Sequence, residues 1–75
     1  MPTLGEYRVG IDFNPSGDEN VAKIKRAAAD LIDLVNSITS QGESSEVTRC
    51  KALAQTALED AAMWAVKAVT KKPRT

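Results

Sequence analysis

Apolar residues follow a helical pattern in VAKIKRAAADLIDLVNSI, residues 21–38, and in VTRCKALAQTALEDAAMWAVKAV, residues 47–69. In each stretch apolar residues recur at alternating spacings of three and four, which places them along one face of an α-helix. The first seam consists of Val21, Ile24, Ala28, Leu31, Val35 and Ile38. The second seam consists of Val47, Cys50, Ala54, Ala57, Ala61, Trp64 and Ala68. The short polar segment at residues 40–45 lets the helices return side by side, so the sequence predicts an all-α antiparallel hairpin.

Glycines, prolines and capping residues divide the first half of the chain. Residues 1–17 hold three of the four glycines and two of the three prolines, so they predict a mostly extended N-terminal leader. A short strand is an alternative for part of this leader, because apolar and polar residues alternate there. Ser16 or Asp18 then caps a helix, and Gly42 favours its end. We therefore expect the first helix over residues 18–40.

The second helix is expected over residues 45–72 of a single domain that spans residues 1–75. Ser44 or Ser45 is its N-cap, and Pro73 stops it. Besides its seam, this helix carries another apolar stripe, formed by Leu58, Ala62, Ala65 and Val69. Helices that are apolar over most of their circumference are usually buried, and a small domain buries little surface by itself. The sequence therefore predicts a homo-oligomer larger than a dimer.

The residue types present exclude most enzymatic chemistry. The chain has no histidine and one cysteine, Cys50, which removes His-dependent catalytic triads, the usual zinc sites and an internal disulfide. We expect no catalysis, no cofactor and no metal ion. Cys50 lies on the second seam, which predicts a small buried hydrophobic side chain and suits a reducing cytoplasm. No segment approaches the roughly 18 apolar residues of a membrane span, so we expect neither membrane insertion nor export.

Four carboxylates in the middle of the two helices have two interpretations. They are Asp30, Asp33, Glu59 and Asp60. All lie away from the apolar seams, which predicts a solvated face that aids solubility. The alternative is a site for a hard cation, since carboxylate oxygens are the ligands that such ions prefer.

An antiparallel hairpin would gather most basic residues at one end, which we call the basic pole. Its cations are Arg8, Lys23, Lys25, Arg26, Lys67, Lys71, Lys72 and Arg74. The acidic residues that offset them in part are Glu6, Asp12, Asp18 and Glu19. The whole chain has no net charge and a pI near 6.2, so binding along a nucleic-acid backbone is not expected. The pole is either a site for a small anion or a set of charges that complements helix ends and keeps the surface soluble.

The anion-site interpretation draws on the turn before the first helix. Asn14 and Ser16 belong to an Asn-Pro-Ser-Gly turn, and the free backbone N–H groups at a helix start favour phosphate. Lys25 adds positive charge nearby. Because Lys25 falls between the seam positions Ile24 and Ala28, we expect it to contribute little to packing.

Two aromatic residues of the leader, Tyr7 and Phe13, offer flat faces on which a base can stack. Arg8 could hold a phosphate while the neighbouring Tyr7 ring stacks. The alternative is that one or both rings pin the leader onto the hairpin. The third aromatic residue, Trp64, lies on the second seam, which favours a core or subunit contact.

The chain contains YRVGIDFNPS at residues 7–16, VAKIKRAAADLI at residues 21–32 and AAMWAVKAV at residues 61–69. Together these segments resemble the hairpin-domain family of phage anti-CBASS cyclic-oligonucleotide sponges. The similarity extends over about residues 5–73. It implies a helical homo-oligomer, typically a hexamer, that sequesters cyclic di- and trinucleotide signals without altering them. It also implies a phage-encoded protein in the cytoplasm of the host cell.

The resemblance also implies roles for individual residues. Lys25 is similar to the lysine that contacts a phosphate at the family's cyclic dinucleotide site. Either Tyr7 or Phe13 is the base-stacking residue, because the spacing from Tyr7 to Lys25 is longer than usual in the family and that from Phe13 is shorter. Lys67 occupies a position where relatives carry arginine and is the candidate for a separate cyclic trinucleotide site. A lysine there lacks the bidentate contact of a guanidinium.

We therefore expect an oligomeric hairpin protein that binds a cyclic oligonucleotide and performs no reaction on it. The expected dinucleotide-binding residues are Tyr7, Arg8, Phe13, Asn14, Ser16 and Lys25. The alternative is a non-enzymatic helical structural or protein-interaction module without a nucleotide ligand. In that case the seams bind another protein, and the basic pole is only a charged surface.

Overall fold

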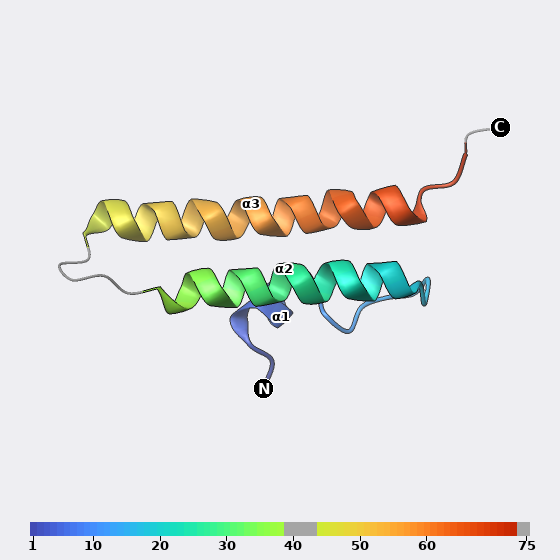
Figure 1. Ribbon diagram of the computed structural model, residues 1–75, viewed down its shortest axis with the longest axis horizontal. Helices are drawn as coiled ribbons and strands as arrows, with labels where there is room; N and C mark the ends of the chain where they lie inside the picture. The colour runs from blue at the N-terminus through green and yellow to red at the C-terminus, as the bar shows by residue number, and fades with distance from the viewer. Residues whose placement is uncertain (39–43, 74–75) are drawn as a thin grey trace.

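The computed structural model describes residues 1–38 and 44–73, and this part of the chain forms three α-helices and no strands. The helices are α1 (Leu4–Val9), α2 (Glu19–Ser37) and α3 (Ser45–Thr70). Figure 1 shows α2 and α3 side by side in antiparallel directions, with the short α1 packed against α2. The predicted all-α hairpin is confirmed.

The N-terminal ends of α2 and α3 follow from their capping side chains. The Asp18 carboxylate accepts a hydrogen bond from the Asn20 amide at 2.7 Å, so Asp18 rather than Ser16 is the N-cap of α2. The Ser44 hydroxyl accepts one from the Val47 amide at 3.4 Å and caps α3. Each cap satisfies a backbone donor that the first turn of a helix leaves free.

Both long helices end earlier than expected. α2 ends at Ser37, because Ile38 has extended backbone angles, φ −66° and ψ 125°. α3 ends at Thr70, and Lys71 is likewise extended. The expected ends at residues 40 and 72 were therefore too late. Gly42, the residue expected to end the first helix, lies outside the described residues.

The leader is not mostly extended, because it contains α1 and no strand. Thr3 caps α1: its hydroxyl accepts from the Glu6 amide at 3.1 Å, and its own amide donates to the Glu6 carboxylate at 2.9 Å. Gly10 ends the helix in the left-handed conformation, with φ 64°. Thr3, Glu6 and Gly10 thus carry helix signals that the glycine and proline content of the leader obscured.

α1 packs on α2 through a glycine. Gly5 is buried, and a Cβ atom there would lie 2.1 Å from the Ala29 carbonyl oxygen, so a larger residue does not fit. The Gly5 amide also donates to the Asp33 carboxylate at 2.7 Å. The predicted solvated face is therefore wrong for Asp33, because this carboxylate fixes α1 to α2.

Arg8 fixes α1 to α3 in a similar way. Its Nε donates to the Glu59 carboxylate at 2.9 Å, and its terminal nitrogens donate to the side chains of Gln55 at 3.4 Å and Thr56 at 3.3 Å. Glu59 is consequently half-buried and paired, so the solvated-face prediction is wrong here too. It holds for Asp30 and Asp60, which are exposed.

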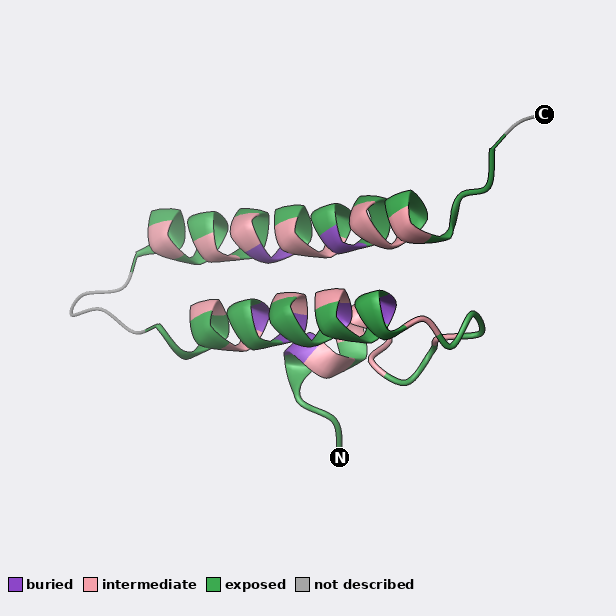
Figure 2. Ribbon diagram, turned by 45° about the vertical axis from the view of Figure 1, so that its right-hand side comes forward, coloured by how far each residue is buried: buried purple, intermediate pink, exposed green. Residues whose placement is uncertain are grey.

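Val21 of the predicted seam is buried as expected, but from Lys25 onward the buried face of α2 lies one position away from that seam. Its buried residues are Val21, Lys25, Ala29 and Ile32. Leu31 and Ile38 of the predicted seam are exposed instead. The difference arises because α1 and α3 both cover α2, so the buried stripe turns toward both helices (Figure 2). The expectation that Lys25 stands outside the packing is therefore wrong.

α3 turns its second apolar stripe toward α2 and most of its predicted seam outward (Figure 2). Ala62 is buried, and Leu58, Ala65 and Val69 are half-buried. The exposed seam residues, which we call the outer stripe, are Cys50, Ala57, Ala61, Trp64 and Ala68. Cys50 is thus not buried in the single chain, and Trp64 is 56% exposed. Small residues occupy both stripes of α3, so spacing alone could not tell which one faces α2.

Candidate functional site

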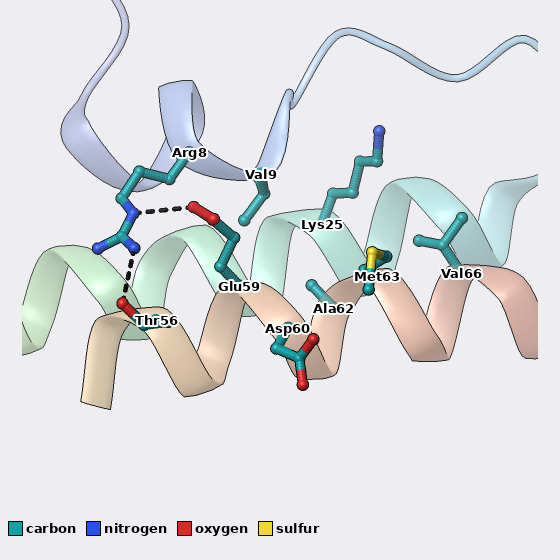
Figure 3. Close-up of a pocket in the computed structure, with 9 residues that line it drawn as sticks. All are labelled: Arg8, Val9, Lys25, Thr56, Glu59, Asp60, Ala62, Met63 and Val66. Carbon is teal, nitrogen blue, oxygen red and sulfur yellow. Dashed lines mark hydrogen bonds and ion pairs between the residues drawn. The ribbon is translucent and has the colours of Figure 1, made fainter. Parts of the chain in front are cut away.

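Lys25 belongs to α2, and its side chain reaches into the connector between α1 and α2. It is 7% exposed, and its ammonium donates to the Gly10 carbonyl at 3.0 Å and to the Phe13 carbonyl. The Phe13 amide donates to the Gly10 carbonyl at 2.9 Å, which closes a turn. Figure 3 shows the Lys25 side chain reaching from α2 toward this connector. A charged side chain is accommodated here because carbonyl oxygens replace its water.

The Phe13 side chain projects from the same turn. It is 71% exposed, and the Lys25 ammonium lies 5.3 Å from the centroid of its ring, within the range of a cation–π contact. One of the two rings predicted to stack on a base and the residue predicted to contact a phosphate are therefore brought together. In the single chain Phe13 does not pin the leader into a core.

A first cleft, which we call the turn cleft, opens between this turn and the end of α3. Its lining residues are Phe13, Asn14, Pro15, Ser16, Val21, Lys25, Val66 and Thr70. Four of the six residues predicted to bind a dinucleotide line it. Val66 and Thr70 come from α3, more than forty residues away in sequence. No motif in the sequence indicated that α3 contributes to this cleft.

Asn14 and Ser16 shape the rim of the turn cleft through hydrogen bonds. The Asn14 side-chain amide donates to the Asp18 carbonyl at 3.0 Å. The Ser16 hydroxyl donates to the Asn14 side-chain oxygen at 2.8 Å and accepts from the Asp18 amide at 3.1 Å. These bonds hold the turn in place at the start of α2. The Asn14 and Ser16 side chains serve as hydrogen-bond partners for the backbone carbonyl and amide of Asp18.

A second cleft, the helix cleft, lies between α1 and α3 (Figure 3). It encloses about 420 Å³ and is lined by Arg8, Val9, Lys25, Thr56, Glu59, Asp60, Ala62, Met63 and Val66. Lys25 and Val66 line both clefts, so the two are neighbours on either side of the Lys25 stem. The bond between Arg8 and Glu59 crosses one end of the helix cleft (Figure 3).

Tyr7 and Arg8 stand apart from the turn cleft. Tyr7 is 77% exposed on α1 and lines neither cleft. The Arg8 guanidinium is engaged with three side chains of α3. The structure therefore places the predicted dinucleotide residues in two groups, with Phe13, Asn14, Ser16 and Lys25 in one and Tyr7 and Arg8 in the other.

A family model for the Acb2/Tad1 hairpin domain matches residues 6–70 of the chain. The chain belongs to this family. The Acb2/Tad1 family is that of the anti-CBASS cyclic-oligonucleotide sponges, so the family suspected from the sequence is confirmed. Comparison with curated proteins finds no match, and comparison with solved structures finds none either.

Membership of the Acb2/Tad1 family implies binding of cyclic nucleotides rather than catalysis. Within the part of the chain that the structure describes, no three acidic or cysteine side chains lie close enough to hold a metal ion. None of the three described helices combines the length and the hydropathy that a membrane span requires.

The basic pole of this Acb2/Tad1 family member is partly neutralised by ion pairs. Arg26 donates to the Glu6 carboxylate at 2.8 Å and to the Asp30 carboxylate at 2.8 Å. The hydrogen bond from Arg26 holds the pKa of the Glu6 carboxyl below its usual value. The pKa of the Arg26 guanidinium is raised in turn, chiefly by its hydrogen bond to Glu6 and then by the one to Asp30. Lys23 lies 3.8 Å from the Glu19 carboxylate. Arg26 is therefore committed to holding α1 and α2 together.

Lys67, the residue suggested for the family's cyclic trinucleotide site, lies on the exposed side of α3. Its ammonium lies 4.8 Å from the centroid of the Trp64 ring. Both side chains are exposed in the single chain. The pair presents a cation and a flat apolar face next to each other. Lys67 lies three residues before Thr70 of the turn cleft, which is less than one turn of α3.

Proposed function

We propose that this protein is a phage immune-evasion protein that binds and sequesters cyclic di- and trinucleotide second messengers of host antiviral signalling, without catalysis. Membership of the Acb2/Tad1 hairpin-domain family supports the proposal. The observation that carries it is the convergence of Phe13, Asn14, Ser16 and Lys25 on the turn cleft. A sponge acts by lowering the free concentration of its ligand, so the site needs affinity and no reactive group.

Lys25 and Phe13 have complementary roles in this proposal. An ammonium has three N–H donors, and two of those on Lys25 bond to the carbonyls of Gly10 and Phe13. The third donor is left for a phosphate oxygen, to which a charge-assisted hydrogen bond is short and strong. The exposed Phe13 ring offers the adjacent face for a base. We therefore assign stacking to Phe13 rather than to Tyr7, which lines neither cleft.

We propose that copies of the chain associate through the outer stripe into a homo-oligomer, and that it is a hexamer, as the family resemblance implies. Support comes from the composition of this stripe, in which alanines allow helices to approach closely and Trp64 offers a large apolar area. The exposed residues Leu53 and Met63 extend the apolar surface of α3. Neighbouring exposed apolar side chains of this kind are typical of surfaces that contact another protein chain.

The cyclic trinucleotide would bind elsewhere, at Lys67, which is exposed on α3. Its ammonium can approach a phosphate, while Trp64 beside it belongs to the outer stripe and contacts a neighbouring copy. Lysine makes a point contact where a guanidinium makes a bidentate one. We therefore expect trinucleotide binding to be weaker than dinucleotide binding.

Calorimetric titration with a panel of cyclic di- and trinucleotides tests the proposal. We expect saturable binding of at least one cyclic dinucleotide, and release of the unchanged ligand when the complex is heat-denatured and separated by chromatography. The matched linear dinucleotide controls for general attraction of phosphate to the basic pole. A protein that binds no member of the panel, or that binds cyclic and linear forms equally, is not a sponge.

The second candidate is a non-enzymatic helical interaction module without a nucleotide ligand. The exposed apolar residues Leu31, Leu34 and Ile38 of α2 favour it, because they lie on a different helix from the outer stripe and could contact another protein. In that case the melting temperature would not respond to any cyclic nucleotide. A ligand at about 100 times its dissociation constant adds about 2.7 kcal/mol of stability, so thermal shift separates the two candidates.

A further inference from the structure

The Lys25 ammonium bonds to the backbone on both sides of a short turn. One bond goes to the carbonyl of Gly10, where the turn begins, and the other goes to the carbonyl of Phe13, where it ends. Gly10 is in the left-handed conformation, with φ 64°. Lys25 as a whole residue is only 7% exposed. The Lys25 side chain therefore stabilises the backbone of the connector in addition to supplying a positive charge.

We infer that Lys25 is a positioning residue, which holds the turn from Gly10 to Phe13 and thereby sets where the Phe13 ring stands at the rim of the turn cleft. The consequence for ligand binding rests on the proposed function. The inference that Lys25 holds the turn is independent of the proposed function, because it concerns the chain without ligand. Lys25 is thus assigned an action through Phe13 that adds to any direct contact with a phosphate.

The backbone geometry at Phe13 explains why the ring depends on Lys25. The Phe13 amide donates to the Gly10 carbonyl at 2.9 Å, and the Phe13 carbonyl accepts from Lys25. The peptide groups before and after the Phe13 Cα are therefore both held. Together they fix the direction of the Cα–Cβ bond, from which the ring projects. Without the ammonium, only the amide side of Phe13 remains held.

Most of the Phe13 side chain is exposed to solvent. It is 71% exposed, and its contact with Lys25 is the cation–π approach at 5.3 Å. An exposed ring on a loose turn loses conformational entropy when it stacks on a ligand, whereas a ring on a fixed turn has lost part of it beforehand. Lys25 therefore preorganises the stacking face.

Hydrogen exchange in the ligand-free protein tests the holding of the turn. Lys25→Met keeps the length of the side chain and removes the ammonium. We expect exchange of the Phe13 amide to accelerate at least about tenfold in this variant, while amides in the middle of α3 keep their protection. Lys23→Met is the matched control, since Lys23 is exposed on the same helix, and we expect it to leave the Phe13 amide unchanged. Unchanged exchange in Lys25→Met overturns the inference.

A double-mutant cycle in ligand affinity tests the action through Phe13. Phe13→Ala should weaken binding of the best cyclic dinucleotide by about 5- to 150-fold, the range expected for loss of one stacked base. Lys25→Met should weaken it at least as much. The double variant should bind within about twofold of Lys25→Met, because a displaced ring has little left to lose. If the two losses multiply instead, Lys25 does not act through Phe13.

A wild-type measurement covers the case in which Lys25→Met does not fold. The ammonium protons of Lys25, bonded to two carbonyls, should exchange slowly enough to appear in a nitrogen-15 NMR spectrum, whereas those of exposed Lys71 and Lys72 should not. Absence of that signal overturns the inference. If the wild type binds no cyclic nucleotide, the proposed function fails, and the exchange experiments still decide whether Lys25 holds the turn.

Discussion

Arg8 and Glu59, which are 51 residues apart in sequence, form the ion pair that joins α1 to α3, with 2.9 Å between Nε and the carboxylate oxygen. Gln55 and Thr56 accept the remaining contacts of the guanidinium. Arg8 is therefore a structural residue in the single chain, although the sequence offered it as a phosphate ligand. The first prediction follows from this pair.

Glu59→Gln should lower the free energy of unfolding by about 1 kcal/mol, because the Glu59 side chain is partly exposed and water screens the pair. Chemical denaturation of the purified protein measures this. Glu46→Gln is the control, since the pair of Glu46 with Arg49 is exposed on both sides, and its effect should stay within about 0.5 kcal/mol. Equal effects of the two substitutions would mean that α1 is not fastened to α3 in solution.

Gly5→Ala should detach α1 from α2. The new Cβ would meet the Ala29 carbonyl at 2.1 Å, and backbone cannot move aside as a flexible side chain can. Overpacking of this kind costs about 1–3 kcal/mol, and the bond from the Gly5 amide to Asp33 is lost with it. Gly17→Asn is the comparison, because Gly17 has φ 65° but open space around it, and Asn tolerates that conformation. We expect Gly17→Asn to be milder by thermal melting.

Glu6 should make stability depend on pH in the acid range. Its pKa is lowered in the folded chain, chiefly by the hydrogen bond from Arg26 and then by the one from the Thr3 amide. The folded state therefore binds this proton less readily than the unfolded state. The contribution of Glu6 is present above the ordinary Glu pKa, about 4.3, and is lost as the pH falls through the lower folded value.

Glu6→Gln tests this pH dependence. The variant should be less stable than the wild type at neutral pH, and the difference should shrink as the pH is lowered. Denaturation at several pH values gives the two curves. A constant difference across the acid range would assign the effect of Glu6 to its place in the capping box and not to its charge.

Trp64→Ser should weaken self-association. Trp64 is the largest side chain of the outer stripe, and its truncation removes apolar area of the kind that dominates interfaces, at a cost of about 2 kcal/mol or more if it is central to the contact. Sedimentation velocity at micromolar concentration measures the assembly. Ala52→Ser, exposed on α3 outside the outer stripe, should leave it unchanged. A wild type that sediments as a monomer would remove the proposed role of the stripe.

The two long helices could be predicted from sequence because their apolar spacing and capping residues, such as Asp18 and Ser44, are local signals. Which side of each helix is buried could not be predicted from sequence. α3 carries two alanine-rich apolar stripes on different sides, and the sequence alone does not tell which of them packs against α2. For α2, the buried stripe includes Lys25, whose burial depends on carbonyls that a distant turn supplies.

The candidate site shows the same division. Phe13, Asn14, Ser16 and Lys25, which the sequence and the family resemblance single out, line one cleft, and their role in ligand binding stays a prediction. The α3 residues that line the clefts were missed, since contacts between distant segments leave no mark in the spacing of either. The role of Arg8 was missed for that reason too, because its partner Glu59 looked like any exposed helical carboxylate.

The outer stripe carries two exposed groups, a thiol and an indole, whose separation can be measured by fluorescence energy transfer. Cys50 is the single thiol and Trp64 the single indole, and both are exposed on α3. Fourteen residues of helix separate them, about 21 Å at a rise of about 1.5 Å per residue. An acceptor dye on the Cys50 sulfur would therefore report indole emission by energy transfer with no engineered residue. Because the Cys50 sulfur belongs to the outer stripe itself, a labelled chain that no longer assembles with unlabelled chains would identify this stripe as the contact surface.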